Sequence, residues 1–392
     1  MQRTALIWDA TLASYRFTAG HPLNPRRLEL TVDLIRRLGL AGDEARPIVT
    51  PREATDAEVL AVHAPEYVDA VSRASAGEGE AAGLSRYGLG TEDVPIVDGM
   101  HAASLRIAGA TLTAAEEVLS GRAVRAFSPA GGLHHARRAE AAGFCVYNDL
   151  AIAARWMQRQ HQARVMIVDI DAHHGDGTQW ILYRDPGVLK VSLHESGAFL
   201  FPGTGFVEEM GEGDGYGYTV NVPLDAHTED DSFIHAVDAL VPELADAFRP
   251  DVVMMQCGCD THVLDPLTHL RCTTRAIEHA VATVCAVADD VCDGRVVATG
   301  GGGYAVHAVV PRAWTLVWAR LAGADVPDAL PEDWVRAMRM ECGSDVPATL
   351  RDAEGAFPPA DRRGAATHAN ARTVDAVRRQ VLPLLTGWGL AF

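Results

Sequence analysis

Hydrophobic residues make up 48% of the 392-residue chain and charged residues 22%, which excludes intrinsic disorder and allows a large core. The net charge is −18, and Lys190 is the only lysine. An acidic chain without a basic tail is a poor candidate for binding nucleic acid, because phosphates are neutralised by clustered cations. The acidity either favours the approach of a cationic substrate or only keeps the protein in solution.

The cysteines and the first residues indicate where the chain works. Its seven cysteines form no CxxC pair, and several lie in apolar runs, as expected in a reducing cytosol. The start, MQRTALIWDA, lacks the apolar stretch of a signal peptide. No run of about 18 uncharged apolar residues predicts a membrane span. We therefore expect a cytoplasmic protein that contacts no membrane.

Short apolar runs, typical of strands buried on both faces, alternate with helical patterns along the chain. The predicted strands begin at Thr4, Ala123, Arg164, Val188, Tyr218, Asp251 and Arg295. The predicted helices cover residues 27–39, 56–74, 101–120, 149–161, 230–248, 274–292 and 311–322. This order predicts an α/β fold in which a central, mostly parallel sheet of about eight strands lies between two layers of helices. We expect residues 1–392 to form a single three-layer domain.

Two stretches depart from this alternation. Residues 75–95 predict a long loop, and long loops in compact α/β domains are often part of the site. From about residue 325 the chain is polar and rich in proline, with a final helix predicted near 373–386. We expect residues 325–392 to form a helical and irregular extension that packs on the outside of the sheet.

Polar side chains and glycines follow four of the predicted strands. The four segments are AGGLHH from residue 130, DIDAHHGDG from 169, CGCD from 257 and GGGGY from 300. Ligands of open α/β sheets bind beyond the carboxyl ends of the strands. The four segments therefore predict one site at that edge.

The DIDAHHGDG segment predicts a metal site. Alternate side chains of an extended segment share a face, so Asp171 and His173 can bind one cation. Asp260 supplies a third ligand from a neighbouring strand end. Two carboxylates and one imidazole with an open position suit catalytic Zn²⁺, and the lack of a cysteine ligand leaves Fe²⁺, Co²⁺ or Mn²⁺ as alternatives. The other interpretation is an Asp-rich loop that caps the next helix.

The adjacent His134 and His135 predict acid–base chemistry. An imidazole beside a metal can act as general base and then as general acid. Its second nitrogen needs a partner that fixes its tautomer, and Asp169 and Asp176 are available for two such dyads. The alternative is a pair of structural histidines.

The four consecutive glycines before Tyr304 form no regular element, and they let a substrate or another segment approach the backbone closely. The Tyr304 hydroxyl can polarise a substrate carbonyl and hold the developing oxyanion. The alternative is a flexible turn followed by an ordinary tyrosine at a helix start.

Together these motifs resemble the zinc-dependent histone deacetylase superfamily. The resemblance covers roughly residues 5–320 and rests on PAGGLHHARRAEAAGFCVYND, DIDAHHGDG, SLHESGAFLFPGTG, VNVPL, QCGCD and GGGGY, which occur in that family's order. GHPLNPRR is similar to its N-terminal motif, and YGLGTEDVP and the length are most similar to the class-I-like, bacterial acetoin-utilisation branch. CGCD departs from the commoner CGAD. The resemblance implies the arginase/deacetylase-like fold.

The resemblance also implies roles for the site residues. His135, paired with Asp176, corresponds to the general base and acid, whereas His134, paired with Asp169, stabilises charge. Tyr304 corresponds to the transition-state tyrosine. The implied catalytic set is His134, His135, Asp169, Asp176 and Tyr304, and the implied zinc ligands are Asp171, His173 and Asp260.

Further positions follow from the same resemblance. The walls of a narrow acyl-lysine tunnel correspond to Gly143, Phe144, Phe201 and Leu267. Asp93 corresponds to a rim residue that grips the substrate backbone, with Glu92 as the alternative, and Arg27 corresponds to the arginine of the product channel. One K⁺ site corresponds to Asp169, Asp171, His173, Ser192 and Leu193, and a second lies near Leu182, Asp185, Val188 and Tyr218.

The implied activity is that of a lysine deacetylase or deacylase, which hydrolyses the side-chain amide of an N-ε-acyl-lysine protein or peptide. Acetyl-CoA synthetase is the substrate that the acetoin-utilisation branch suggests. One alternative is an acetylpolyamine amidohydrolase, against which the class-I-like GGGGY segment counts. Another is a non-catalytic acyl-lysine binder, which would be expected to have lost a catalytic residue or a metal ligand.

Overall fold

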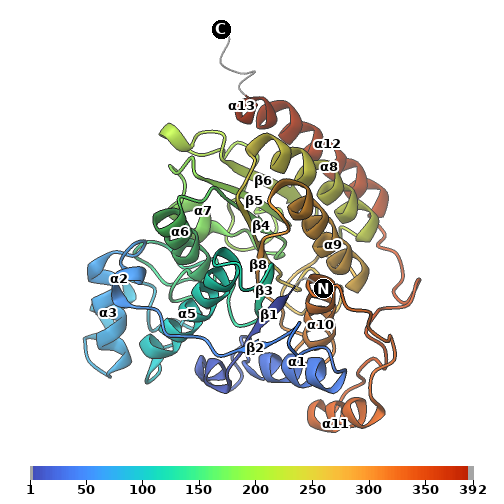
Figure 1. The fold of residues 1–392 in the computed structure, drawn as a ribbon, viewed down its shortest axis with the longest axis horizontal. Helices are drawn as coiled ribbons and strands as arrows, with labels where there is room; N and C mark the ends of the chain where they lie inside the picture. Colours follow the sequence, from blue (N-terminus) through green and yellow to red (C-terminus); the bar gives the residue numbers. More distant parts are fainter. Residues whose placement is uncertain (1–2, 387–392) are drawn as a thin grey trace.

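A sheet of eight parallel strands runs through residues 3–386, the part of the chain that the computed structural model describes (Figure 1). The strand order is β2-β1-β3-β8-β7-β4-β5-β6. The strands are β1 (Thr4–Ile7), β2 (Ile48–Val49), β3 (Arg125–Ser128), β4 (Val165–Asp169), β5 (Val188–Glu195), β6 (Thr219–Leu224), β7 (Val252–Gln256) and β8 (Val296–Thr299). The predicted α/β class with a parallel eight-stranded sheet is confirmed.

Helices cover both faces of this sheet. α5 and α6 pack on one face, and α8, α9 and α10 pack on the other (Figure 1). The helices are α1 (Arg26–Arg37), α2 (Asp56–Val59), α3 (Pro65–Ser75), α4 (Ala81–Ser85), α5 (Met100–Leu119), α6 (Asp149–His161), α7 (Asp176–Ile181), α8 (Asp230–Phe248), α9 (Thr274–Val291), α10 (Val310–Leu321), α11 (Glu332–Cys342), α12 (Arg363–Gln380) and α13 (Leu382–Leu385). None of the described helices combines the length and the hydropathy that a membrane span requires.

The register of the central strands aligns their carboxyl ends. All residues of β4 and β7 are buried, as their continuous apolar sequences predict for strands covered on both faces. Asp169, the last residue of β4, pairs with Ser192 of β5 and with Gln256 of β7. Gln256 in turn pairs with Thr299, the last residue of β8. The segments that follow β4, β7 and β8 therefore leave the sheet at the same edge.

Several helix boundaries differ from those predicted. The stretch predicted as one helix over 56–74 forms α2 and α3, because Pro65 cannot continue a helix and instead occupies the first turn of α3. The predicted loop 75–95 contains the short helix α4. The last long helix, α12, begins ten residues before the predicted start of 373, in a polar segment without a continuous apolar face.

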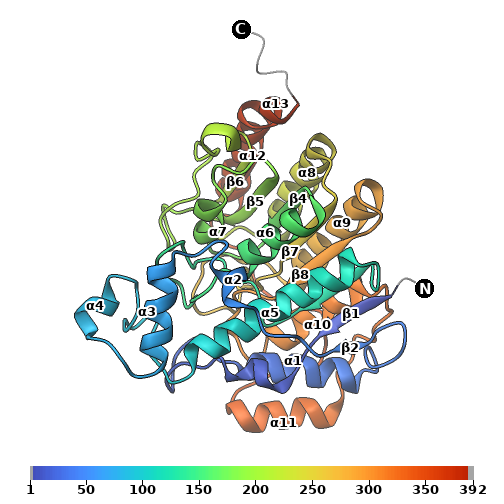
Figure 2. The ribbon, with the colours of Figure 1, turned by 60° about the vertical axis from the view of Figure 1, so that its left-hand side comes forward.

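Residues after α10 pack against the sheet and its helices. α11 lies against α1, where Trp334 and Met338 join Leu30 and Leu34 in a small apolar cluster (Figure 2). α12 packs on β6 and α8. Between them, an irregular strap over residues 343–362 reaches the sheet edge where the polar segments gather.

Candidate active site

The structure brings Asp171, His173 and Asp260 together at the carboxyl ends of β4 and β7. One ligand atom from each residue lies within 4.8 Å of the others, and all three side chains are buried. The Nδ1 atom of His173 lies 2.9 Å from Asp260 Oδ2 and 3.2 Å from Asp171 Oδ1. Burial and the nearby charge of Asp171 raise the pKa of Asp260. Two buried carboxylates so close together, with an imidazole, fit a divalent cation that would neutralise them.

Backbone and amide groups orient these carboxylates. The N–H of Gly302 and the Nε2 of Gln256 each donate to Asp171 Oδ2 at 2.7 Å. The N–H of Ala172 donates to Asp260 Oδ1 at 2.8 Å. Such bonds fix the direction in which a ligand oxygen points. Sequence reasoning did not identify Gln256, although it stands directly before CGCD.

The glycine run is required by close approach. A Cβ atom at Gly302 would lie 2.1 Å from Asp260 Oδ2 and 2.8 Å from Asp171 Oδ2. These separations are shorter than any van der Waals contact, so a side chain at this position would displace the carboxylates. The glycine therefore allows the backbone to lie directly against the ligand oxygens.

His134 and His135 form two buried dyads. His134 Nδ1 lies 2.7 Å from Asp169 Oδ2, and His135 Nδ1 lies 2.7 Å from Asp176 Oδ1. The two Nε2 atoms lie 3.1 Å apart. Because each Nδ1–H donates to its carboxylate, the Nε2 atoms are the ones left to exchange protons, and His134 Nε2 lies 3.9 Å from Asp171 Oδ1.

The two imidazoles differ in charge. Burial opposes a charge on His134, but the carboxylates of Asp169 and Asp171 outweigh it and raise the pKa of His134 to about 9. Burial and the charge of His134 lower the pKa of His135 to about 4. His135 is therefore neutral near pH 7 and can accept a proton, while His134 carries a positive charge.

An arginine supports the His135 dyad. Arg137 donates from Nη2 to Asp176 Oδ2 at 2.8 Å, on the oxygen that His135 does not use. Although burial opposes it, the hydrogen bonds from His135 and Arg137 lower the pKa of Asp176 to about 2. Asp176 thus stays ionised. Arg137 stands two residues after the histidine pair, and sequence reasoning did not identify it.

Tyr304 lies at the edge of the site with its ring 6.4 Å from the His173 ring, between centroids. Its backbone N–H donates to Asp265 Oδ2 at 2.7 Å. Burial raises the pKa of the Tyr304 phenol. The hydroxyl is therefore protonated and available as a hydrogen-bond donor.

The sequence of this chain matches the histone deacetylase domain over residues 21–321. The acetoin utilization protein AcuC of Bacillus subtilis (strain 168) is 43% identical over 374 residues, which covers 95% of this chain and 96% of that protein. AcuC of Staphylococcus xylosus is 38% identical over 380 residues, or 96% of this chain and 97% of that one.

The chain belongs to the histone deacetylase family. The crystal structure of an HDAC homologue from Aquifex aeolicus matches 95% of this chain and 100% of its own, with a TM-score of 0.84 and 30% identity. An HDAC homologue complexed with SAHA matches equally well. The resemblance seen in the motifs is confirmed, and the protein is a deacetylase hydrolase of a metal-dependent family.

Two aromatic rings lie beside His135 and Tyr304. The Phe201 ring lies 5.1 Å from His135, and the Phe144 ring lies 5.7 Å from Tyr304, between centroids. Gly143 has a positive φ of 53°, and a Cβ there would lie 2.1 Å from the His135 ring. The structure thus brings Gly143, Phe144 and Phe201 to the side of His135 and Tyr304.

The rim residues differ in what they contact. Asp93 accepts a hydrogen bond of 2.6 Å from the N–H of Gly143 through Oδ2, and its backbone oxygen lies 3.2 Å from His21 Nε2. Glu92 is exposed to solvent. Leu267 is half-buried and donates its N–H to Asp265 Oδ1 at 3.0 Å, in the loop that also binds Tyr304.

Arg27 lies behind the glycine run. It is buried at the start of α1, donates from Nη1 to the oxygen of Gly303 at 2.9 Å, and stacks 5.1 Å from the Trp314 ring. A Cβ at Gly303 would meet the sulfur of Cys259 at 2.6 Å. Cys259, the second cysteine of CGCD, therefore fills the space beside Gly303.

The two places where the resemblance puts monovalent cations differ in their surroundings. Asp169 and Ser192 pair in register between β4 and β5, beside Leu193 and behind the His134 dyad. At the second place, Lys190 Nζ donates to the oxygen of Leu182 at 2.8 Å and lies 3.5 Å from the oxygen of Asp185. Burial lowers the pKa of Lys190 to about 7. The Lys190 amino group therefore already contacts the backbone oxygens at that place.

Proposed function

We propose that this deacetylase hydrolyses the side-chain amide of N-ε-acyl-lysine in proteins or peptides, with Zn²⁺ bound by Asp171, His173 and Asp260. The observation that carries the proposal is the pair of buried His–Asp dyads beside the triad: His134 and His135 each lie 2.7 Å from a carboxylate, and their Nε2 atoms lie 3.1 Å apart. A neutral His135 and a charged His134 supply a proton acceptor and a positive charge in one place. Amide hydrolysis requires both.

The donor set fits the ion. Bound there, Zn²⁺ would supply Lewis-acid polarisation of the acyl carbonyl and would make the attacking water more acidic. The same ligands accept Fe²⁺, Co²⁺ or Mn²⁺, so the native ion is part of the proposal.

The protein's own groups carry the protons. His135 Nε2 accepts the proton of the attacking water, and the ionised Asp176 stabilises the imidazolium that forms. The proton then passes to the leaving lysine nitrogen. The Tyr304 hydroxyl donates a hydrogen bond to the oxyanion of the tetrahedral intermediate. The positive charge on His134, held by Asp169, favours that oxyanion.

The approach fits a lysine side chain. Phe144 and Phe201 present apolar rings beside His135 and Tyr304, and an apolar wall suits the four methylenes of an acyl-lysine. We propose that Asp93 binds the substrate backbone at the rim and that Arg27 lines the route by which the carboxylate product leaves.

We also propose a protein substrate, a bound monovalent cation and a cellular location. We propose acetyl-CoA synthetase as a protein substrate, as the motif resemblance to the acetoin-utilisation branch implies. A K⁺ ion is proposed at the oxygens around Asp169 and Ser192. All seven cysteines have free thiols, which supports a reducing, cytoplasmic location.

Acetate release tests the function. We expect the enzyme to deacetylate an acetyl-lysine peptide with a higher kcat/KM than acetylputrescine, and to lose activity to a chelator and regain it with Zn²⁺. The opposite preference would favour the polyamine amidohydrolase. A panel of acetyl-, propionyl- and crotonyl-lysine peptides then defines the acyl group.

Tyr304→Phe tests the oxyanion donor. Loss of such a donor costs about 2.7–4 kcal/mol, so kcat should fall about a hundredfold or more while the metal content stays unchanged. Full activity of this variant on the acetyl-lysine peptide would exclude the role of Tyr304.

A further inference from the structure

A buried ion cluster joins the strap after α11 to the catalytic edge of the sheet. Asp352 accepts hydrogen bonds from His262 Nε2 at 2.9 Å, from Arg312 Nη2 at 2.8 Å and from the N–H of Thr274 at 3.0 Å. The side chains of His262 and Arg312 are fully buried. Asp352 lies outside residues 21–321, the part of the chain that matches the family domain. A residue beyond the domain match thus contacts a histidine that lies two residues after Asp260.

Asp352 determines the tautomer of His262. The N–H of Leu264 donates to His262 Nδ1 at 3.1 Å, so this nitrogen carries no proton. The proton must then be on Nε2, where Asp352 accepts it. A carboxylate that fixes one nitrogen of an imidazole also fixes the bond made by the other. Asp352 therefore stabilises the turn from His262 to Leu264.

This turn belongs to the loop that holds both ends of the catalytic centre. Asp260, a residue of the buried triad, lies two residues before His262. The N–H of Asp265 donates to the oxygen of His262 at 2.8 Å, and Asp265 Oδ2 accepts the N–H of Tyr304. A movement of His262 would therefore shift a metal-ligand candidate and the oxyanion donor together.

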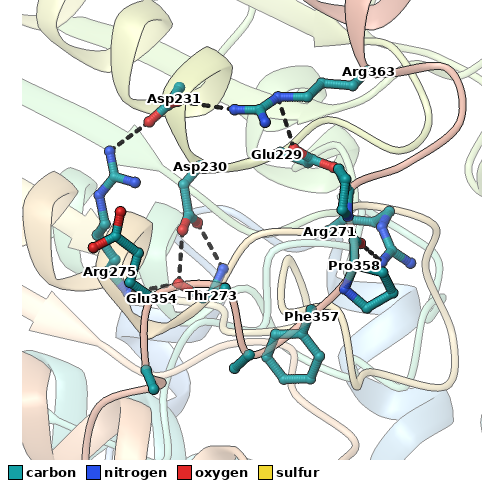
Figure 3. Close-up of a pocket in the computed structure, with 14 residues that line it drawn as sticks. Glu229, Asp230, Asp231, Arg271, Thr273, Arg275, Glu354, Phe357, Pro358 and Arg363 are labelled. Carbon is teal, nitrogen blue, oxygen red and sulfur yellow. Dashed lines mark hydrogen bonds and ion pairs between the residues drawn. The ribbon is translucent and has the colours of Figure 1, made fainter.

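Ion pairs and a hydrogen bond also hold the strap on the C-terminal side of Asp352. Residues 353–359 cross a polar pocket between the starts of α8 and α9 (Figure 3). On its far side, Arg363 pairs with Glu229 at 3.0 Å and with Asp231 at 3.1 Å, and Arg271 donates to the oxygen of Pro358 at 2.8 Å (Figure 3). These contacts hold the strap on both sides of the pocket. Asp352 is thus presented from a segment with little freedom to move.

We propose that Asp352 is a positioning residue of the active site, which acts through His262 to hold Asp260 and Tyr304 in place. This inference rests on the proposed metal site of Asp171, His173 and Asp260. It gives the segment after the family domain a role in the reaction.

Two variants of His262 separate positioning from stability. In His262→Asn, the amide oxygen takes the place of Nδ1 and can still accept from Leu264, but the side chain no longer reaches Asp352. In His262→Gln, the amide nitrogen takes the place of Nε2 and can still donate to Asp352. Both leave the Arg312–Asp352 pair intact, whereas Asp352→Asn leaves the buried Arg312 without its counter-charge.

The matched control is Glu278→Gln. Glu278 pairs with Arg351, the residue before Asp352, at 2.7 Å, and with Arg320 at 2.9 Å. This variant loosens the strap next to Asp352 without touching His262. Its effect on the metal site and on activity therefore shows what a loss of stability alone would cause.

The experiment uses the full chain loaded with Co²⁺ or Zn²⁺. It measures the visible spectrum of the Co²⁺ form, the rate at which a chelator removes Zn²⁺, and kcat and KM on an acetyl-lysine peptide. We expect His262→Asn to alter the Co²⁺ spectrum, to speed Zn²⁺ loss by up to about tenfold and to lower kcat more than it raises KM. His262→Gln keeps the hydrogen bond to Asp352 but loses the acceptor for the Leu264 N–H, so it should change these three quantities less than His262→Asn does. Glu278→Gln should lower the melting temperature only.

Two results would contradict the inference, and they differ from each other. If His262→Asn and Asp352→Asn keep the wild-type spectrum, rate of Zn²⁺ loss and kcat, or if Glu278→Gln matches them, Asp352 has only a structural role. If the wild-type chain itself binds no stoichiometric metal, the proposed metal site fails and this inference fails with it. Should His262→Asn not fold, His262→Gln and Asp352→Asn carry the comparison.

Discussion

Two identical side chains, His134 and His135, acquire different chemistry from their neighbours. Each imidazole has one carboxylate on Nδ1 at 2.7 Å. His134 also faces Asp171, whereas His135 faces the positive charge of His134. The surrounding charges thus prepare one ring as a cation and the other as a base.

The pH dependence of catalysis tests this difference. A base works only when unprotonated, so kcat/KM should fall as the pH drops through the pKa of His135, which is lowered to about 4. In His134→Gln, one cause of that lowering is removed. The pKa of His135 should rise, and the acid limb of kcat/KM should move to higher pH.

Profiles of kcat/KM between about pH 4 and pH 8 measure the shift. His279→Gln, which removes an exposed imidazole paired with Asp238, is the control and should leave the limb unchanged. An acid limb at the same pH in wild type and His134→Gln would contradict the coupling.

At the scale of elements, the site is built where strands end and irregular segments begin. β4 and β7 provide the triad, and the glycine run after β8 packs its backbone against the carboxylates. The strands place these segments at one edge, and the glycines let them approach one another. Strand register and the absence of side chains on the glycines therefore matter as much as the triad residues themselves.

Gly302→Ala tests the close approach. The added methyl would meet Asp260 Oδ2 at 2.1 Å, so the carboxylates must move apart. We expect metal affinity to fall at least about tenfold, with a comparable loss of activity. Gly364→Ala, where a Cβ meets nothing within 4 Å, is the control. Equal metal content in the two variants, measured after dialysis, would show that the contact is not required.

At the scale of the whole molecule, the charge of −18 surrounds a site proposed to accept a lysine derivative. An acidic surface attracts cationic partners over a distance that salt shortens. The protein also has only one lysine, and Lys190 is buried. The chain therefore offers its own active site no exposed lysine.

Ionic strength tests this attraction. For an acetyl-lysine peptide flanked by arginines, kcat/KM should fall several-fold as salt rises from about 0.02 M to about 0.2 M. The same peptide with glutamines in place of the arginines should show little change. An equal salt response of both peptides would assign the acidity to solubility alone.

Much of the architecture and of the candidate site could be predicted from the sequence because the information is local. Continuous apolar strands predict a parallel sheet that is buried on both faces. Residues two positions apart at the end of a strand point to the same side, as Asp171 and His173 do. The adjacent histidines and the glycine run were visible for the same reason. Because the strands are parallel, their carboxyl ends lie at one edge of the sheet, and so do the segments that follow them.

Only the tertiary structure showed which distant groups support the site. Arg137 on Asp176, Gln256 on Asp171 and Asp352 on His262 are ordinary polar residues in sequence, and nothing in their neighbours marks them. The partners of Asp352 lie 40 to 90 positions away along the chain. Their pairing follows from packing helices and straps around the sheet, because burial forces each polar group to find a partner across space.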